Sequence, residues 1–273
     1  MPTPETSTRV AMTRRLSVSL LSLVLVVLAA GAPFAQQGRG RGAQNVPPAP
    51  PHDPRDLSGI WLGRAVQRID TAPPVFTPAG RIAFDANKPS FGARAVAPAM
   101  GNDPLGGANP PGLPRVLINH AGRIQFIQLP DKMVQLVEWT RVWREIFTDG
   151  RPLPRDPDTA WYGYSVGRWE GNEFVVDTIG LDTRAWVDQE GNPKSEDARI
   201  QERYHRLDRD NLQVTVSMTD PRFYVKPFGG DNRVMFRLQP KTPEGGFSED
   251  IFAPIDEESF NQRVRNPAGG VVK

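Results

Sequence analysis

The sequence contains no cysteine and has only three histidines among its 273 residues. Without cysteine the chain has no disulfide and no thiolate, so an exported domain must be held together by its core alone. No two of His52, His120 and His205 stand at the spacing of a metal-ligand pair. We therefore expect no metal site, and we find no motif that would hold a cofactor.

Long hydrophobic runs are also scarce, and the clearest one covers residues 16–30. Arg14 and Arg15 precede it and the small residues Ala30-Gly31-Ala32 end it, which is the pattern of a cleavable secretory signal. A membrane-spanning helix needs about 20 apolar residues, so the run is too short for an anchor. We expect residues 1–35 to be a signal peptide. The mature protein is then periplasmic or extracellular, with no membrane insertion.

The chain has no excess of charge of either sign, with 33 Lys and Arg against 31 Asp and Glu. Its net charge of +2 equals that of residues 1–35, which hold Glu5, Arg9, Arg14 and Arg15. The mature protein is therefore close to neutral. Nucleic-acid binding would require a persistent basic patch, so we expect no nucleic-acid partner.

Residues 36–55 ("QQGRGRGAQNVPPAPPHDPR") have no apolar periodicity and are rich in glycine and proline. Such a composition favours an extended spacer. The pattern Gly38-x-Gly40-x-Gly42 is not a phosphate-binding loop, because no strand precedes it and no helix follows. We expect residues 56–273 to form a single domain.

Proline and glycine are abundant, at 28 and 25 residues, and leave little room for long helices. Residues 71–114 are loop-like, with at most one short helix at residues 77–87, where Pro78 suits the first turn. The rest of the domain consists of short alternating runs joined by turn residues such as Glu170-Gly171-Asn172. These runs predict about nine strands at the spacing of an antiparallel barrel or sandwich: residues 59–67, 123–129, 133–139, 142–148, 161–169, 173–179, 198–207, 212–220 and 233–240.

The strand at residues 198–207 has an alternative interpretation. Arg199–Arg206 ("RIQERYHR") is rich in good helix formers, so a polar helix fits it as well. The turn and the clear strand that follow favour a hairpin.

Residues 163–167 match the pattern G-x-S-x-G of the nucleophile elbow. The elbow requires a strand-to-helix turn, whereas here a glycine turn and another strand follow. We interpret Gly163 and Gly167 as points where a strand bends, and Ser165 as a hydroxyl that lines a pocket.

Charged residues inside strands are candidates for a site, because an inward-facing acid must pair with a cation or shift its pKa. Glu138, Glu145, Asp177 and Glu202 lie within predicted strands, as do Arg144 and Arg203. The alternative for each is an outward cross-strand ion pair. His205 is either a base or an exposed strand residue.

Six tryptophans are many for a small β domain, and most of them should belong to the core. Trp161 and Trp186 stand at junctions of loop and strand, where a flat ring can line a cavity. The resulting candidate ligand-binding residues are Trp161, Ser165, Trp186, Arg144, Asp177 and Glu202.

The chain resembles a large group of secreted bacterial proteins that look like lipocalin-like β-barrels. The resemblance is carried by residues 146–180, 183–196, 200–208 and 219–228, with "NPPGLPR" at residues 109–115 and "DLSGIW" at residues 56–61. Gly59-Ile60-Trp61 is similar to the glycine-x-tryptophan of the first lipocalin strand. This chain has Lys194-Ser195-Glu196 where the group often has His-Ser-Glu, and it lacks the group's cysteine. It would therefore lack any mechanism based on that histidine.

Together these features predict an all-β, antiparallel, lipocalin-like (calycin-type) meander barrel of about 8–10 strands with long Pro/Gly-rich loops. Such a barrel is about wide enough to hold one small ligand, here a partly apolar molecule. One alternative is a barrel enzyme, a lyase, isomerase or hydrolase, with general acid–base chemistry. Its candidate catalytic residues are Asp177, Glu202, Arg144 and His205. A second alternative is an envelope-associated interaction protein, which would show a large exposed apolar patch.

Overall fold

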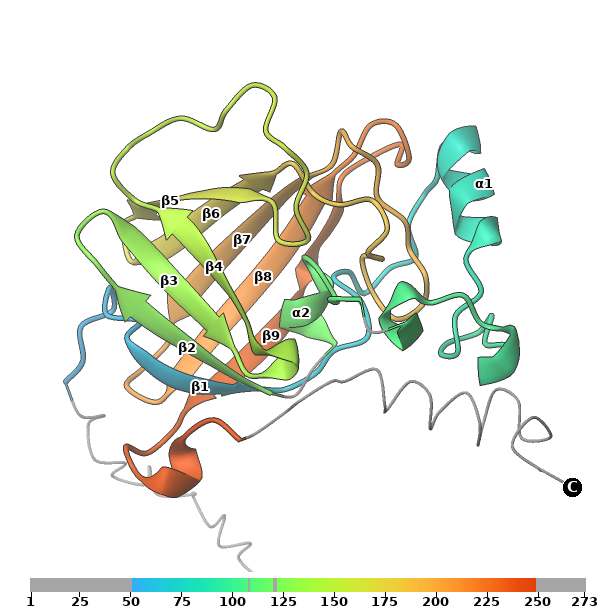
Figure 1. Ribbon diagram of the computed structural model, residues 1–273. Helices are drawn as coiled ribbons and strands as arrows, with labels where there is room; N and C mark the ends of the chain where they lie inside the picture. Colours follow the sequence, from blue (N-terminus) through green and yellow to red (C-terminus); the bar gives the residue numbers. More distant parts are fainter. Residues whose placement is uncertain (1–50, 108, 120–121, 249–273) are drawn as a thin grey trace, which may run out of the picture. The chain divides into compact units, whose positions relative to one another are not determined.

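Nine β-strands follow one another around a closed barrel (Figure 1). The computed structural model describes residues 51–107, 109–119 and 122–248, which belong to one compact unit, Pro48–Lys273. The expected signal peptide, residues 36–50 of the expected spacer, and His120 lie outside the described residues. The strands are β1 (Gly59–Gly63), β2 (Arg123–Gln128), β3 (Lys132–Val137), β4 (Val142–Phe147), β5 (Tyr164–Glu170), β6 (Glu173–Ile179), β7 (Arg199–Arg206), β8 (Asn211–Thr219) and β9 (Phe228–Leu238).

Alternation of buried and exposed residues shows how the sequence forms these strands. In β7, Ile200, Glu202, Tyr204 and Arg206 are buried, while the residues between them are partly exposed. Successive side chains of a strand point to opposite faces, so these four face the inside of the barrel. β7 pairs with β6 on one side and with β8 on the other, so the helical alternative for this segment is wrong.

One pair of neighbouring strands departs from the expected arrangement. Eight of the nine neighbouring pairs are antiparallel, but β4 and β5 are parallel. A parallel pair needs a long connection that returns the chain to the same end of the sheet. Residues 148–163 form that connection, so Asp149-Gly150 does not close a hairpin into β5. The all-β barrel is confirmed, whereas a wholly antiparallel meander is wrong at this pair.

Helices are short and take no part in the barrel wall. At the place where a helix was expected, the structure has α1 (Pro78–Ala86), capped by the Thr77 hydroxyl, which accepts a hydrogen bond from the Gly80 N–H at 3.1 Å. A second helix, α2 (Arg115–Ile118), was not expected. Single 3₁₀ turns are η1 (Pro98–Met100), η2 (Pro104–Gly107), η3 (Trp139–Arg141) and η4 (Pro243–Gly245).

No helix within the described residues is both long enough and apolar enough to span a membrane.

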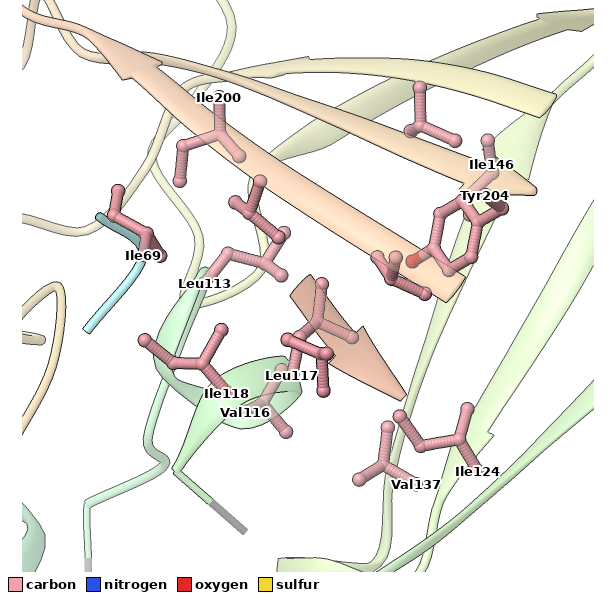
Figure 2. Packing of buried hydrophobic residues seen from close by; sticks show 14 of the residues in the cluster. Ile69, Leu113, Val116, Leu117, Ile118, Ile124, Val137, Ile146, Ile200 and Tyr204 are labelled. Atoms are coloured by element: carbon pink, nitrogen blue, oxygen red, sulfur yellow. The ribbon is translucent and has the colours of Figure 1, made fainter. Parts of the chain in front are cut away.

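The core continues from the inside of the barrel into α2. All four residues of α2 are buried, and Val116, Leu117 and Ile118 belong to the same hydrophobic cluster as the inward side chains of the strands. Figure 2 shows these side chains beside Ile124 and Val137. The barrel itself contains large, almost fully buried rings: Trp61, Phe126, Phe174 and Tyr204. Side chains therefore occupy much of the interior.

Candidate functional site

The barrel wall is weakest between β4 and β5. These strands share only the residue pairs Ile146↔Ser165 and Phe147↔Val166, whereas β5 and β6 share seven pairs. The first part of β4 therefore faces residues 160–163, which do not continue β5 as a strand. A pocket of about 500 Å³ opens here, lined by Trp143, Arg144, Glu145 and Phe147 of β4 and by residues 160–165. We call it the β4–β5 pocket.

The chain is held in place just before β5 by close backbone contacts. Gly163 has φ 62°, and a Cβ at this position would lie 2.5 Å from the Ile179 carbonyl oxygen, so a larger residue does not fit. The Ala160 N–H donates to the Gly180 carbonyl at 2.9 Å. These contacts fix Trp161 at the edge of the pocket. The first glycine of the G-x-S-x-G pattern thus allows a close approach of two backbone segments.

Arg144 and Glu202 form a buried ion pair inside the barrel. Arg144 Nη2 donates to Glu202 Oε1 at 2.9 Å and to Oε2 at 3.0 Å, with side-chain exposures of 4% and 0%. The Nε and Nη1 atoms of Arg144 are buried and have no hydrogen-bond partner. Buried polar groups are normally satisfied, so these two nitrogens, which face the inside of the barrel, are exceptions.

Tyr204 and Gln135 extend the polar cluster around Glu202. The Tyr204 hydroxyl donates to Glu202 Oε2, and Gln135 Nε2 donates to the Tyr204 oxygen at 3.3 Å. Burial, with a further contribution from the Glu202 charge, raises the pKa of Tyr204 well above its usual value. The phenol therefore stays protonated and stays a donor. Nearby, Ser165 Oγ and Thr178 Oγ1 share a hydrogen bond of 2.9 Å.

Aromatic rings form the outer part of the pocket. Phe147 and Tyr164 stack with their centroids 5.3 Å apart, and Trp143 is 68% exposed. The guanidinium of Arg184 lies 4.6 Å from the Trp161 ring centroid. The pocket is therefore lined largely by aromatic residues, with Glu145 among them, and small-molecule sites are lined mainly by such apolar rings.

The structure brings together four of the predicted ligand-binding residues. Trp161, Ser165 and Arg144 line the β4–β5 pocket, and Glu202 pairs with Arg144. Asp177 lies elsewhere: it pairs with Arg168 and accepts a hydrogen bond from Gln201, which places it on the opposite face of the wall from Glu202.

The remaining candidates also lie apart from this pocket. His205 has a 41% exposed side chain, with Nδ1 3.4 Å from Glu173. Trp186 is 3% exposed, and the Arg115 guanidinium lies 5.9 Å from its ring centroid. Glu138 pairs with Arg123, and Arg203 with Glu170 and Glu173.

Sequence reasoning did not single out Trp143, Phe147, Tyr164, Gln135 or Tyr204. Tyr204 could have been predicted, because it lies two residues after Glu202 and therefore points to the same face of the strand. Trp143 and Tyr164 directly precede Arg144 and Ser165 in the chain. Their proximity to each other depends on the parallel β4–β5 pairing, which no local pattern indicates.

A larger hollow, of about 1060 Å³, lies beside the ends of β1 and β9 and contains buried Arg206. Arg206 donates to the carbonyl oxygens of Asp53, Asp56, Asp208 and Arg209. Its guanidinium is thus used to hold loops together. We favour the β4–β5 pocket because several aromatic residues gather around it.

A second group of buried polar residues lies in residues 181–198, outside the pocket. Burial raises the pKa of Asp188 to about 6 and lowers the pKa of Lys194 to about 7. Lys194 Nζ donates to the Ala185 carbonyl, and Asn192 Nδ2 donates to Asp188 at 2.7 Å. Ser195 donates to Asp220 from both its N–H and its hydroxyl, each at 2.7 Å. These bonds hold the segment against the barrel.

Within the described residues, no three His, Asp or Glu side chains gather as a metal site would require. Comparisons of the chain with models of protein families, with curated proteins and with solved structures found no match in any of the three.

Proposed function

We propose that the mature protein is an exported, lipocalin-like barrel that binds a small, partly apolar molecule in the β4–β5 pocket. The observation that carries the proposal is the gathering of Trp143, Phe147, Trp161 and Tyr164 around an opening in the barrel wall. A volume of about 500 Å³ suits one small organic molecule. The signal-like N-terminus supports export to the periplasm or the exterior.

The proposed site lies at the wall of the barrel rather than in its interior, where the sequence led us to expect a ligand. Trp61, Phe126 and Tyr204 fill central positions, whereas the β4–β5 pocket opens to the surface. Entry then requires no strand to separate, because β4 pairs with β5 only at Ile146 and Phe147 and residues 142–145 have no β5 partner.

The proposal is tested with the neutral fluorescent probe N-phenyl-1-naphthylamine and the intact protein. We expect saturable binding with an increase in probe emission. Trp161→Ala should weaken binding by about tenfold or more, because a lining aromatic ring contributes much of the contact energy.

Phe91→Ala is the matched control, because Phe91 is a 56% exposed aromatic residue that does not line the pocket. It should bind the probe as the unchanged protein does. Absence of saturable binding, or equal binding by Trp161→Ala and the unchanged protein, would contradict the proposal.

A further inference from the structure

The wall of the barrel contains a short stretch of strand that lacks a neighbouring strand on one side. β4 pairs with β3 along its whole length, but it pairs with β5 only at Ile146 and Phe147. Residues 142–145 therefore have no strand beside them on the β5 side. This stretch borders the β4–β5 pocket and indicates the kind of ligand that the pocket takes. The step rests on the function proposed above.

The main chain of this stretch forms part of the pocket. The side chain of Arg144 points into the barrel, yet Arg144 lines the pocket. It does so through its main-chain atoms, whereas the side chains of Trp143 and Glu145 lie on the outer face of the strand. A ligand in the pocket therefore contacts the backbone of β4 as well as aromatic rings.

The hydrogen-bond pattern of β3 and β4 shows which main-chain groups face the pocket. The Thr148 N–H donates to the Asp131 carbonyl at 2.8 Å, one position beyond the last residues that the two strands pair. Residues of an antiparallel pair alternate between those that bond to the partner strand and those whose N–H and C=O point away from it. The even-numbered residues of β4 therefore bond to β3, whereas Trp143 directs its N–H and C=O to the β5 side.

In the described part of the chain, these two groups of Trp143 have no backbone partner on that side. Trp143 pairs with no residue of β5 and has no backbone hydrogen bond to residues 160–163. The facing segment is held by other bonds: the Trp161 carbonyl accepts from the Leu113 N–H at 3.2 Å, and the Gly163 N–H donates to the Ala160 carbonyl at 3.1 Å. Backbone groups of a sheet are normally paired, so this donor and this acceptor are available to a ligand.

An extended peptide carries the matching groups. One residue of a peptide that lies antiparallel to β4 exchanges two hydrogen bonds with Trp143: its N–H donates to the Trp143 carbonyl, and its carbonyl accepts from the Trp143 N–H. Paired residues have their side chains on the same face of a sheet, so the side chain of this peptide residue lies against the Trp143 ring. Phe147 and Trp161 line the same pocket, so the residue should be apolar or aromatic.

We propose that the β4–β5 pocket binds a short extended peptide, which adds a strand beside residues 142–145 and places an apolar or aromatic side chain against Trp143. The peptide main chain supplies the hydrogen bonds, and this side chain supplies the apolar contact. A volume of about 500 Å³ suits a short segment and excludes a folded domain.

Three peptides with the same side chains test this proposal by titration calorimetry with the intact protein at pH 7.5. The parent is acetyl-Ser-Val-Phe-Val-Ser-amide. In one derivative a methyl group replaces the N–H hydrogen of the Phe, and in the other it replaces that of the following Val. Methylation of the Phe should weaken binding by about tenfold or more, because it removes the hydrogen bond to Trp143. The N–H of the following Val points away from β4, so its methylation is the matched control.

Amide hydrogen exchange, followed by NMR, reports on Trp143 directly. Its N–H should exchange quickly in the free protein and about tenfold or more slowly when the parent peptide saturates the pocket. The N–H of Arg144 bonds to β3 and is the internal control, which should exchange slowly in both states.

A pair of variants separates the contribution of the ring from that of the main chain. Trp143→Ala removes the ring but keeps the N–H and C=O, so it should weaken binding while the two methylated peptides still differ. Trp143→Pro also removes the N–H, which β3 does not use, and should bind the parent peptide about tenfold more weakly than Trp143→Ala. Phe91→Ala, outside the pocket, should bind as the unchanged protein does. The comparison of the three peptides on the unchanged protein remains decisive even if Trp143→Pro fails to fold.

The outcomes separate this inference from the function on which it rests. Equal binding of the three peptides, or unchanged exchange of the Trp143 N–H in the saturated protein, overturns the addition of a strand to β4. If N-phenyl-1-naphthylamine binds and the parent peptide does not, the pocket remains a small-molecule site and the peptide inference is wrong. If neither binds, the proposed function fails as well.

Discussion

Arg144 and Glu202 stand 58 residues apart in the chain and meet inside the barrel, where both side chains are almost fully excluded from solvent. Two buried charges seldom add stability over apolar residues of the same size, but loss of one partner leaves the other charge uncompensated. The pair therefore adds little stability of its own, but each partner makes burial of the other possible.

Replacing one partner should destabilise the protein more than replacing both. Glu202→Gln leaves the guanidinium of Arg144 buried without a counter-charge, and we expect a loss of about 3–5 kcal/mol in the free energy of unfolding. Arg144→Met combined with Glu202→Gln removes both charges and should recover much of that loss. Urea denaturation of the three proteins measures the effect. A double variant as unstable as Glu202→Gln would show that the charge itself is not the cause.

For individual residues, the sequence indicated which ones were unusual but not where their side chains point. Arg144, Asp177 and Glu202 were all noted as charges inside strands. Glu202 faces inward and Asp177 outward, and a shift of one residue in a strand is enough to reverse the face. Their pairing partners depend on the strand register across the barrel, which the local pattern does not contain.

Elements bounded by clear turns were predicted well. The β5–β6 and β7–β8 hairpins form around Glu170-Gly171-Asn172 and around residues 208–211, as the turn residues indicate. The parallel β4–β5 pair was missed because its connection, residues 148–163, carries no signal for the direction of return. The four-residue helix α2 was missed because it is too short to show a helical period.

The segment of residues 181–198 has a conformation that hydrophobic patterning could not reveal, because its buried residues include Asp188, Asn192, Lys194 and Ser195. Such polar residues usually indicate exposure. Here hydrogen bonds to the backbone and to Asp220 make burial possible. Burial of Asp188 and Lys194 has a consequence for stability as the pH changes.

The stability of the fold should pass through a minimum near pH 6–7. Burial raises the pKa of Asp188 from 3.8 to about 6, so the folded state holds this proton more tightly and loses stability as the pH rises through that window. Burial lowers the pKa of Lys194 from 10.5 to about 7, so the unfolded chain binds the proton more tightly and stability rises between pH 7 and 10.5. Thermal unfolding measured from acidic pH to pH 10.5 tests both the acidic limb, where stability falls as the pH rises, and the alkaline limb, where stability increases again.

Lys194→Met should raise the free energy of unfolding at pH 6.5 by about 1–3 kcal/mol and remove the alkaline rise. Asp188→Asn should flatten the acidic limb. Lys226→Met, at an exposed lysine, is the control and should leave the profile unchanged. A profile of Lys194→Met that keeps its alkaline rise would assign that rise to another group.

Across the whole molecule, the barrel closes where its first strand meets its last. β1 pairs with β9 through Trp61↔Leu238, Leu62↔Arg237 and Gly63↔Phe236, so no strand of the barrel is left as an open edge. The sequence predicted both strands but could not show that they pair, because nearly the whole domain separates them. Closure depends on close packing at this seam, and Gly63 is the point of closest fit.

Gly63 and Phe236 should be energetically coupled across the seam. A Cβ at position 63 would lie 2.7 Å from the Phe236 ring, so Gly63→Ala should destabilise the barrel by about 1–3 kcal/mol. Phe236→Leu removes the ring atoms that the new Cβ would contact. In that background Gly63→Ala should therefore lower the free energy of unfolding clearly less. A double-mutant cycle from urea denaturation measures the coupling, and Arg237→Ala, at an exposed position of the same strand, is a neutral control. If the effects of the two substitutions on the free energy of unfolding are strictly additive, the packing of position 63 against Phe236 does not constrain the closure of the barrel.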